Sequence, residues 1–154
     1  MTGVSKTVCF VCYGNLCRSP MAAAIMSDII ERDPQLSRRD IKICSAGTGA
    51  IGGHPAHHNA QETMNEWGLS LDNHVTRRLS SDIVDGSDLI LTLDSYVKED
   101  VIRSFPNSLD KMCFLNIEDP YGHSIVAYRH CAQQIRDNCI SSVLPLVKSL
   151  FERE

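Results

Sequence analysis

The chain has 154 residues, of which 43% are hydrophobic, and a net charge of −4 at pH 7. This length suits one compact domain with its own core, here taken as residues 1–154. The slight acidity argues against a general nucleic-acid binder, and no apolar stretch is long enough to cross a membrane. The polar segment Met1–Lys6 lacks the apolar part of a secretory signal, so we expect a cytoplasmic protein.

Short apolar segments alternate with helical patterns along the chain. The apolar segments predict strands at 7–11, 41–44, 88–94 and 112–117. The 3.6-residue pattern predicts helices at about 19–33, 56–67, 95–104 and 124–151, a short helical turn near 83, and a kink at Pro145. We take Ser19 as the N-cap of the first helix and Gly68 as the end of the second. The alternation predicts an α/β fold: a four-stranded parallel sheet with helices on both faces, Rossmann-like.

Ligands of such folds bind beyond the carboxyl ends of the strands. Cys12, the segment 45–49, Asp94 and the residues after Ile117 all follow predicted strands. They should therefore meet at one edge of the sheet, where we place the functional site.

The loop from Cys12 to Arg18 carries the most specific chemical signal. Gly14 and Asn15 allow tight curling of the backbone, and a curled loop that opens a helix points N–H groups inward to bind an anion. Arg18 adds a planar fork suited to phosphate oxygens. The same positive surroundings stabilise a thiolate on Cys12, so the loop fits a nucleophile aimed at a bound phosphate.

The seven cysteines form no zinc-binding pattern, and we expect reduced thiols with neither metal nor cofactor. Cys9, Cys44 and Cys113 lie in predicted strands, and Cys131 and Cys139 in a predicted helix. All five are interpreted as small buried side chains.

The segment from Val11 to Pro20 resembles the signature of the low-molecular-weight protein tyrosine phosphatases. Four further segments resemble that family in order and spacing: 45–50, His74 with Arg77, 88–94, and Asp119-Pro120-Tyr121. The resemblance implies the phosphotyrosine protein phosphatase I-like fold. It also implies a reaction in which Cys12 attacks the phosphorus and Asp119 serves as general acid and then as base.

The resemblance assigns supporting roles as well. Arg18 and the loop residues Tyr13, Gly14, Asn15, Leu16 and Cys17 would bind the phosphate oxygens. Ser19 would hydrogen-bond Cys12, besides capping the helix. Asn15, Ser45 and His74 would form a network that holds the loop, and Asp94 would either orient Arg18 or only cap the next helix. In the family, the cysteine that matches Cys17 can form a protective disulfide with the nucleophile, which implies redox regulation here.

The walls of the substrate slot depart from the family pattern. Ile51 replaces a common aromatic residue, whereas Tyr13 stands where an aliphatic residue is usual, and Tyr121 forms a further wall. Gly122-His123 replaces a second tyrosine of many eukaryotic members. The histidines at 54, 57 and 58 lack a carboxylate or cysteine that would complete a metal site. We interpret them as a solvated loop and helix start, with His54 at the pocket rim.

The implied partners are phosphotyrosine proteins or aryl phosphates, with inorganic phosphate as product and inhibitor. Nucleic acid and membrane are not expected as partners, and we expect a monomer, with a weak dimer as the alternative. Two other functions stay open: an arsenate reductase of the same fold, and a non-catalytic phosphotyrosine-binding module. Asp119-Pro120 and the lack of a cysteine between Cys44 and Cys113 argue against the first. The presence of Cys12, Arg18 and Asp119 argues against the second.

Overall fold

The computed structural model describes residues 4–152, so the first three residues of the polar N-terminal segment lie outside it. The four strands are β1 (Lys6–Cys12), β2 (Ile41–Gly47), β3 (Leu89–Thr92) and β4 (Met112–Phe114). They form one parallel sheet in the order β2-β1-β3-β4. The parallel α/β fold predicted from the sequence is therefore confirmed.

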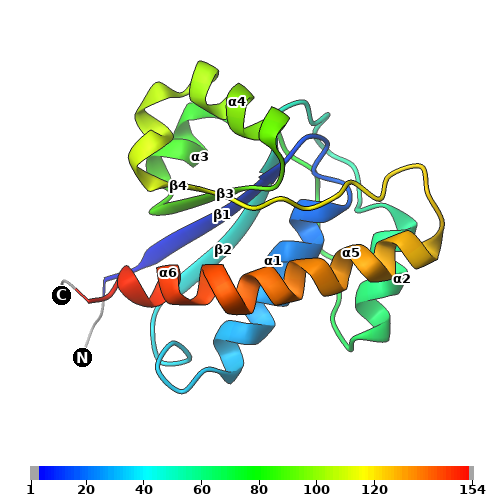
Figure 1. Cartoon of the computed structure of the whole chain (residues 1–154), viewed down its shortest axis with the longest axis horizontal. Helices are drawn as coiled ribbons and strands as arrows, with labels where there is room; N and C mark the ends of the chain where they lie inside the picture. The colour runs from blue at the N-terminus through cyan, green and yellow to red at the C-terminus, as the bar shows by residue number, and fades with distance from the viewer. Residues whose placement is uncertain (1–3, 153–154) are drawn as a thin grey trace.

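Helices cover both faces of this sheet (Figure 1). One face carries α1 (Arg18–Arg32), α5 (Ile125–Asn138) and α6 (Leu144–Ser149), with α2 (His58–Glu66) packed beside α1 and α5. The other face carries α3 (Ser81–Gly86) and α4 (Ser95–Ser104). Because successive strand residues point to opposite faces, Val8 and Phe10 enter the first core while Cys9 and Val11 enter the second. β1 is thus buried on both sides and anchors the residues that follow it.

The first helix buries the stripe that the sequence predicted, but it begins differently. Cys17 occupies the N-cap position without a side-chain hydrogen bond, and Arg18 and Ser19 already lie in the helix. The prediction that Ser19 caps this helix is therefore wrong. Its hydroxyl is committed to other partners, which are described with the site.

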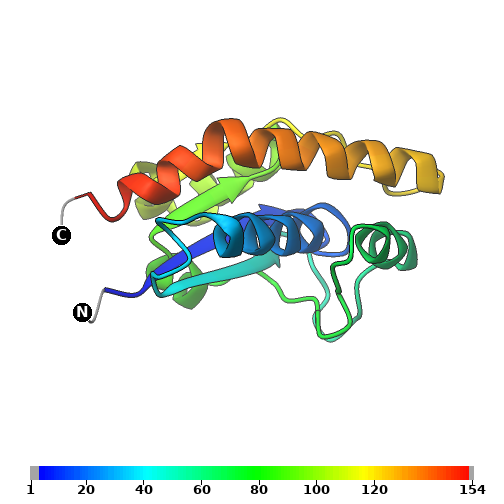
Figure 2. The same ribbon diagram turned by 90° about the horizontal axis from the view of Figure 1, so that it is seen from below.

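The predicted C-terminal helix is interrupted near its end. A π-helical turn, Cys139–Val143, separates α5 from α6. Pro145 has no N–H to donate to the carbonyl four residues earlier, so the helix changes its hydrogen-bond pattern next to it. The helical stretch nevertheless continues in nearly one direction: Figure 2 shows α5 and α6, orange to red, running along α1.

Four smaller differences concern segment ends and burial. The last two strands are shorter than predicted, and a 3₁₀ helix, Pro106–Lys111, precedes β4. α2 starts at His58, and Gly68 follows its end with φ +75°, in agreement with its predicted role. Cys44 and Cys113 are only partly buried, so the interpretation of these two as buried core residues is wrong.

The strand order places a switch point beside β1. The chain leaves β1 for β2 on one side and later returns to β3 on the other, which opens a crevice at the carboxyl ends of the two central strands. Two main-chain hydrogen bonds keep the chain segments side by side beyond the ends of β3 and β4. The Leu93 N–H donates to the Val11 carbonyl (3.0 Å), and the Ile117 N–H donates to the Leu93 carbonyl (2.9 Å). Cys12, Asp94 and Asp119 consequently emerge at one edge.

Candidate active site

Cys12 ends β1 and opens the loop 12–18 that leads into α1 (Figure 1). Its side chain is 3% exposed. The Cys12 Sγ lies 2.9 Å from Ser19 Oγ and accepts a hydrogen bond from the Asn15 N–H at 3.3 Å. Both groups can donate to sulfur, so the pair is suited to stabilise a thiolate at the base of the loop.

Asn15 holds the curve of this loop. Among the described residues it is the one non-glycine with positive φ, at +58°, and it is fully buried. Its Nδ2 donates to Ser19 Oγ at 2.8 Å and to Ser45 Oγ at 3.0 Å. Its main-chain oxygen lies 2.9 Å from His74 Nε2. The structure thus brings together Asn15, Ser45 and His74, as the sequence predicted.

Arg77 joins the same network through both its backbone and its side chain. The Arg77 N–H donates to Asn15 Oδ1 at 2.9 Å, and the Arg77 Nε donates to the Ser45 carbonyl at 3.1 Å. Burial first, and then the Arg77 charge, lower the pKa of His74, while the bond to the Asn15 carbonyl acts in the opposite direction. An uncharged His74 with its proton on Nε2 can still donate to Asn15.

Arg18 is buried at 3% exposure and faces two carboxylates. Its Nη1 donates to Asp94 Oδ2 at 2.8 Å and to the Ile117 carbonyl at 3.0 Å, and its Nη2 lies 3.6 Å from Asp119 Oδ2. Burial opposes the positive charge, but the Asp94 bond and the charges of Cys12 and Asp119 raise the pKa of Arg18. The guanidinium is therefore held charged and oriented next to the Cys12–Arg18 loop.

Asp94 performs both of the roles left open by the sequence. Its Oδ2 accepts from Arg18, and its Oδ1 accepts from the Val97 N–H at 2.8 Å, which caps α4. A carboxylate at this helix start is stabilised by the first-turn N–H groups. One side chain thereby couples the position of Arg18 to a fixed helix.

Asp119 lies on the segment after β4 and is 51% exposed. Its Oδ1 accepts from the Tyr121 N–H at 3.1 Å, which ties the carboxylate to its own turn. The other oxygen faces Arg18. An exposed carboxylate at this distance can reach a group bound in the loop.

These residues line one cavity of about 700 Å³. Tyr13, Ile51 and Tyr121 stand at its mouth with 61%, 75% and 58% of their surfaces exposed. A Cβ on Gly49 would lie 2.4 Å from Tyr13 Cζ, so only glycine lets the Tyr13 ring rest on this backbone. The full lining is Cys12, Tyr13, Gly14, Leu16, Cys17, Arg18, Gly49, Ala50, Ile51, His54, Pro55, Asp119 and Tyr121.

Cys17 contacts Tyr128, which the sequence pattern identifies only as an apolar residue of the C-terminal helix. Its Sγ lies 3.3 Å from the hydroxyl of Tyr128, a fully buried residue of α5. Burial raises the pKa of Cys17 to about 12, although the Tyr128 bond acts against this shift. The thiol is therefore protonated at neutral pH, and its disulfide with Cys12 stays a prediction.

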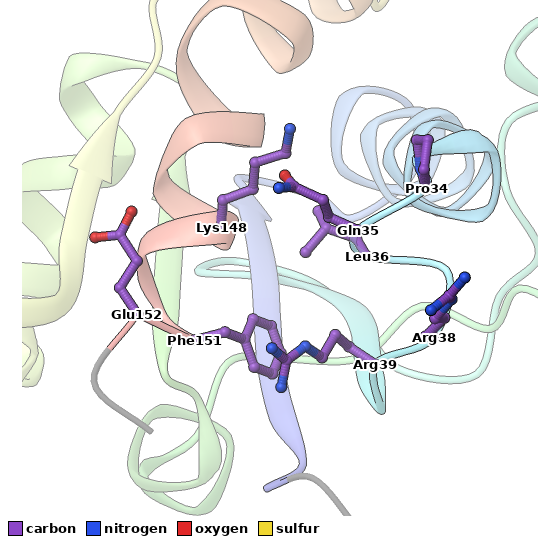
Figure 3. A pocket seen from close by; sticks show the side chains of 8 residues that line it. All are labelled: Pro34, Gln35, Leu36, Arg38, Arg39, Lys148, Phe151 and Glu152. Carbon is purple, nitrogen blue, oxygen red and sulfur yellow. The ribbon is translucent and has the colours of Figure 1, made fainter. Parts of the chain in front are cut away.

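Another cavity, of about 820 Å³, is lined by the eight residues labelled in Figure 3. Two of its charged side chains have partners: Lys148 Nζ lies 3.2 Å from Asp33 Oδ2, and the Arg39 guanidinium lies 4.8 Å from the centre of the Phe151 ring. None of the predicted site residues lines it. Within residues 4–152, no three His, Cys, Asp or Glu side chains are grouped to hold a metal ion, and no helix is long and apolar enough to span a membrane.

Cys44 has unusual surroundings for a strand cysteine. It pairs with Cys9 across the β1–β2 ladder. The neighbouring Cys9 thiol and then the Arg77 charge, against the effect of burial, lower the pKa of Cys44 to about 7. Burial raises the pKa of Cys131 and Cys139 to about 12. With saturating phosphate present, we expect iodoacetamide at pH 8 to label Cys44 well before those two thiols, as measured by peptide mass.

An Arg77→Gln variant provides the control for this prediction. Because the guanidinium helps to stabilise the Cys44 thiolate, labelling of Cys44 should slow in this variant, while labelling of Cys139 should not change. Equal labelling rates for Cys44 and Cys139 in the unmodified protein would contradict the expected difference.

Comparisons with known proteins agree with this geometry. The sequence model of the family described as "Low molecular weight phosphotyrosine protein phosphatase" matches residues 7–151. A probable low molecular weight protein-tyrosine-phosphatase, EpsP of Ralstonia nicotianae, is 30% identical over 151 residues, covering 94% of this chain and 98% of the relative. A protein-arginine-phosphatase of Bacillus subtilis is 32% identical over 152 residues, covering 93% of this chain and 95% of the relative. The crystal structure of YfkJ from Bacillus subtilis matches with a TM-score of 0.84 and 27% identity, over 96% of this chain and 98% of that one.

Proposed function

Because this chain belongs to the low molecular weight phosphotyrosine protein phosphatase family, we propose that it hydrolyses phosphotyrosine and small aryl phosphate monoesters through a phosphocysteine on Cys12. The observation that carries this proposal is that Cys12, Arg18 and Asp119 line one cavity. A nucleophile, a fixed cation and a proton donor are the three groups that such a transfer needs.

In the first step, the Cys12 thiolate attacks the phosphorus, so that an S–P bond forms and the ester P–O bond breaks. Arg18 and the loop N–H groups stabilise the charge on the equatorial oxygens. Protonated Asp119 gives its proton to the departing phenolate. Ser19, 2.9 Å from the sulfur, stabilises the thiolate before attack.

In the second step, water attacks the phosphocysteine while Asp119, now a carboxylate, takes a proton from it. The S–P bond breaks, the electron pair returns to Cys12, and inorganic phosphate is released. The Ser19 hydroxyl and the Asn15 N–H favour the departing thiolate. Since phosphate fits the same loop, it is expected to inhibit as well.

The shape of the mouth favours a flat aromatic group. Two tyrosine rings and Ile51 surround the entrance, and the apolar Leu16 lines its side. Aromatic rings gain from packing on such walls. A relative named as a protein-arginine-phosphatase is about as similar as one named as a tyrosine phosphatase, so phosphoarginine is the competing substrate to assay.

We further propose that the protein acts as a monomer in a reducing compartment such as the cytoplasm. All seven cysteines are free thiols, and the chemistry requires Cys12 in that state. Protein phosphotyrosine and aryl phosphates are its proposed partners.

The role of Asp119 gives the sharpest test of this function. The native protein should hydrolyse p-nitrophenyl phosphate, phenyl phosphate and a phosphotyrosine peptide, and a phosphoarginine peptide more slowly. Asp119→Asn should lower kcat by roughly 10²-fold or more on phenyl phosphate. The loss should be smaller on p-nitrophenyl phosphate, because p-nitrophenolate leaves more easily without a proton.

Two results would contradict the proposal. If phosphoarginine is the faster substrate, then the assigned substrate class is wrong. If Asp119→Asn loses the same factor on both aryl esters, then this carboxylate does not protonate the leaving group. Glu118→Gln, which changes the neighbouring carboxylate, is the matched control and should keep kcat within about twofold.

A further inference from the structure

His57 connects the start of α2 to the Cys12–Arg18 loop through its side chain and its backbone. It is the N-cap of α2, where its Nδ1 accepts from the Asn59 N–H at 3.1 Å. Its own N–H donates to the Leu16 carbonyl at 2.9 Å. The start of α2 is thereby tied to the loop that begins at Cys12.

The ring of His57 lies among three other rings. It stacks on Tyr128 at 5.2 Å between centroids and on His58 at 4.4 Å. It meets Tyr121 edge to face, at 5.7 Å and 78°. Both the distance and the angle to Tyr121 fall in the range that aromatic pairs prefer. Tyr121 is otherwise 58% exposed, so this contact restrains a side chain that is largely surrounded by solvent.

The uncharged form of His57 suits these contacts. Nδ1 accepts the capping bond, so it must carry no proton, and in the neutral ring the proton sits on Nε2. Burial first, and then the charge of His58, lower the pKa of His57. The neutral ring can therefore cap the helix and pack against the tyrosines at the same time.

We propose that His57 is a positioning residue that holds Tyr121 at the mouth of the cavity and so sets the affinity for the aryl part of the substrate. This inference rests on the proposed phosphatase function. His57 does not line the cavity, so it acts through Tyr121. Phosphate binding at the base of the loop should not depend on the His57 ring.

Two substitutions separate the two contributions of His57. Asparagine is a preferred N-cap, so His57→Asn keeps the helix start and removes the ring. Phenylalanine keeps a ring but offers no acceptor, so His57→Phe removes the cap and keeps the packing surface. Each variant thus serves as the control for the other.

For His57→Asn, we expect KM for phenyl phosphate to rise roughly two- to tenfold, the change that one aromatic contact supports. Its kcat should change less than about twofold, and the inhibition constant of inorganic phosphate should match the native value. For His57→Phe, KM should stay near the native value, while Tm falls by about 3 °C through loss of the cap.

A double-mutant cycle tests whether His57 acts through Tyr121. In the Tyr121→Ala background, His57→Asn should raise KM no further. His58→Asn is the matched control. The exposed His58 ring stacks on His57 rather than on Tyr121, so the KM of this variant should remain native.

The inference is overturned if His57→Asn has native KM, or if its effect persists in full without the Tyr121 ring. The first result would assign His57 to helix capping alone. A native protein that hydrolyses no aryl phosphate would instead overturn the proposed function, and the two failures are thus distinguishable.

Discussion

Replacing Cys12 with serine is expected to abolish turnover of p-nitrophenyl phosphate, with kcat falling by roughly 10⁴-fold or more. A serine hydroxyl is smaller than a thiol but has the same shape, and it stays protonated at neutral pH, so it is a much weaker nucleophile than the Cys12 thiolate. Ser19 and the Asn15 N–H both donate toward this position, which stabilises an anion there but does not create one from an alcohol.

Binding should survive this substitution. Arg18 keeps its bonds to Asp94 and to the Ile117 carbonyl, so titration calorimetry should give a dissociation constant for inorganic phosphate within about threefold of native. Cys113→Ser is the matched control, since it makes the same change at a partly buried thiol that does not line the cavity, and it should retain most of the native turnover. Native-like turnover by Cys12→Ser would exclude the phosphocysteine.

Most of the fold follows from hydrophobic periodicity. The buried stripe of α1, the bounds of α4 and the burial of β1 on both faces agree with the pattern of apolar residues. Periodicity does not predict segments that differ from an α-helix only in their backbone hydrogen-bond pattern. The π-helical turn near Pro145 keeps the apolar period of an ordinary helix, whereas the 3₁₀ helix before β4 has too few apolar residues to show any period, so the pattern identifies neither.

Ser19 shows how function overrides a local preference. The sequence Ser-Pro is typical of a helix start, yet the Ser19 hydroxyl contacts Cys12 and accepts from Asn15. Its oxygen is therefore unavailable to the first-turn N–H groups. A local motif alone does not reveal that competition.

Sequence reasoning missed three contacts because the residue types involved do not indicate them. Arg77 belongs with His74 to a family-like segment, but the resemblance assigns it no contact, and its support of Asn15 comes from its N–H, which any residue except proline could supply. Tyr128 fits the apolar period of its helix, so its hydroxyl contact with Cys17 is invisible in the pattern. His57 caps a helix although histidine is not among the preferred N-cap residues. For Arg77 and Tyr128, tertiary packing decides the partner, because the contacting residues are far apart in the sequence.

The phosphate end of the site therefore depends on a few buried polar bonds rather than on apolar packing. Asn15 contributes most of them, since its amide contacts Ser19, Ser45 and the Arg77 N–H. A buried network in which one member is removed leaves its partners unsatisfied. This makes Asn15 the position where stability and catalysis should fail together.

Asn15→Ala is accordingly expected to lower the free energy of unfolding by about 3–5 kcal/mol, from the lost bonds and from alanine at φ +58°. kcat should fall by roughly 10²-fold, because the loop N–H groups lose their fixed direction. Urea unfolding and steady-state turnover measure the two effects.

Asn15→Gly separates the lost bonds from the backbone strain. Glycine tolerates positive φ, so this variant should be roughly 1 kcal/mol more stable than Asn15→Ala, while its kcat stays low because the same side-chain bonds are missing. If glycine restores kcat to native, the loop needs only its backbone shape, and the bonds from Asn15 to Ser45 and Arg77 have no part in catalysis. If alanine and glycine are equally stable, the amide bonds alone account for the effect of Asn15 on stability.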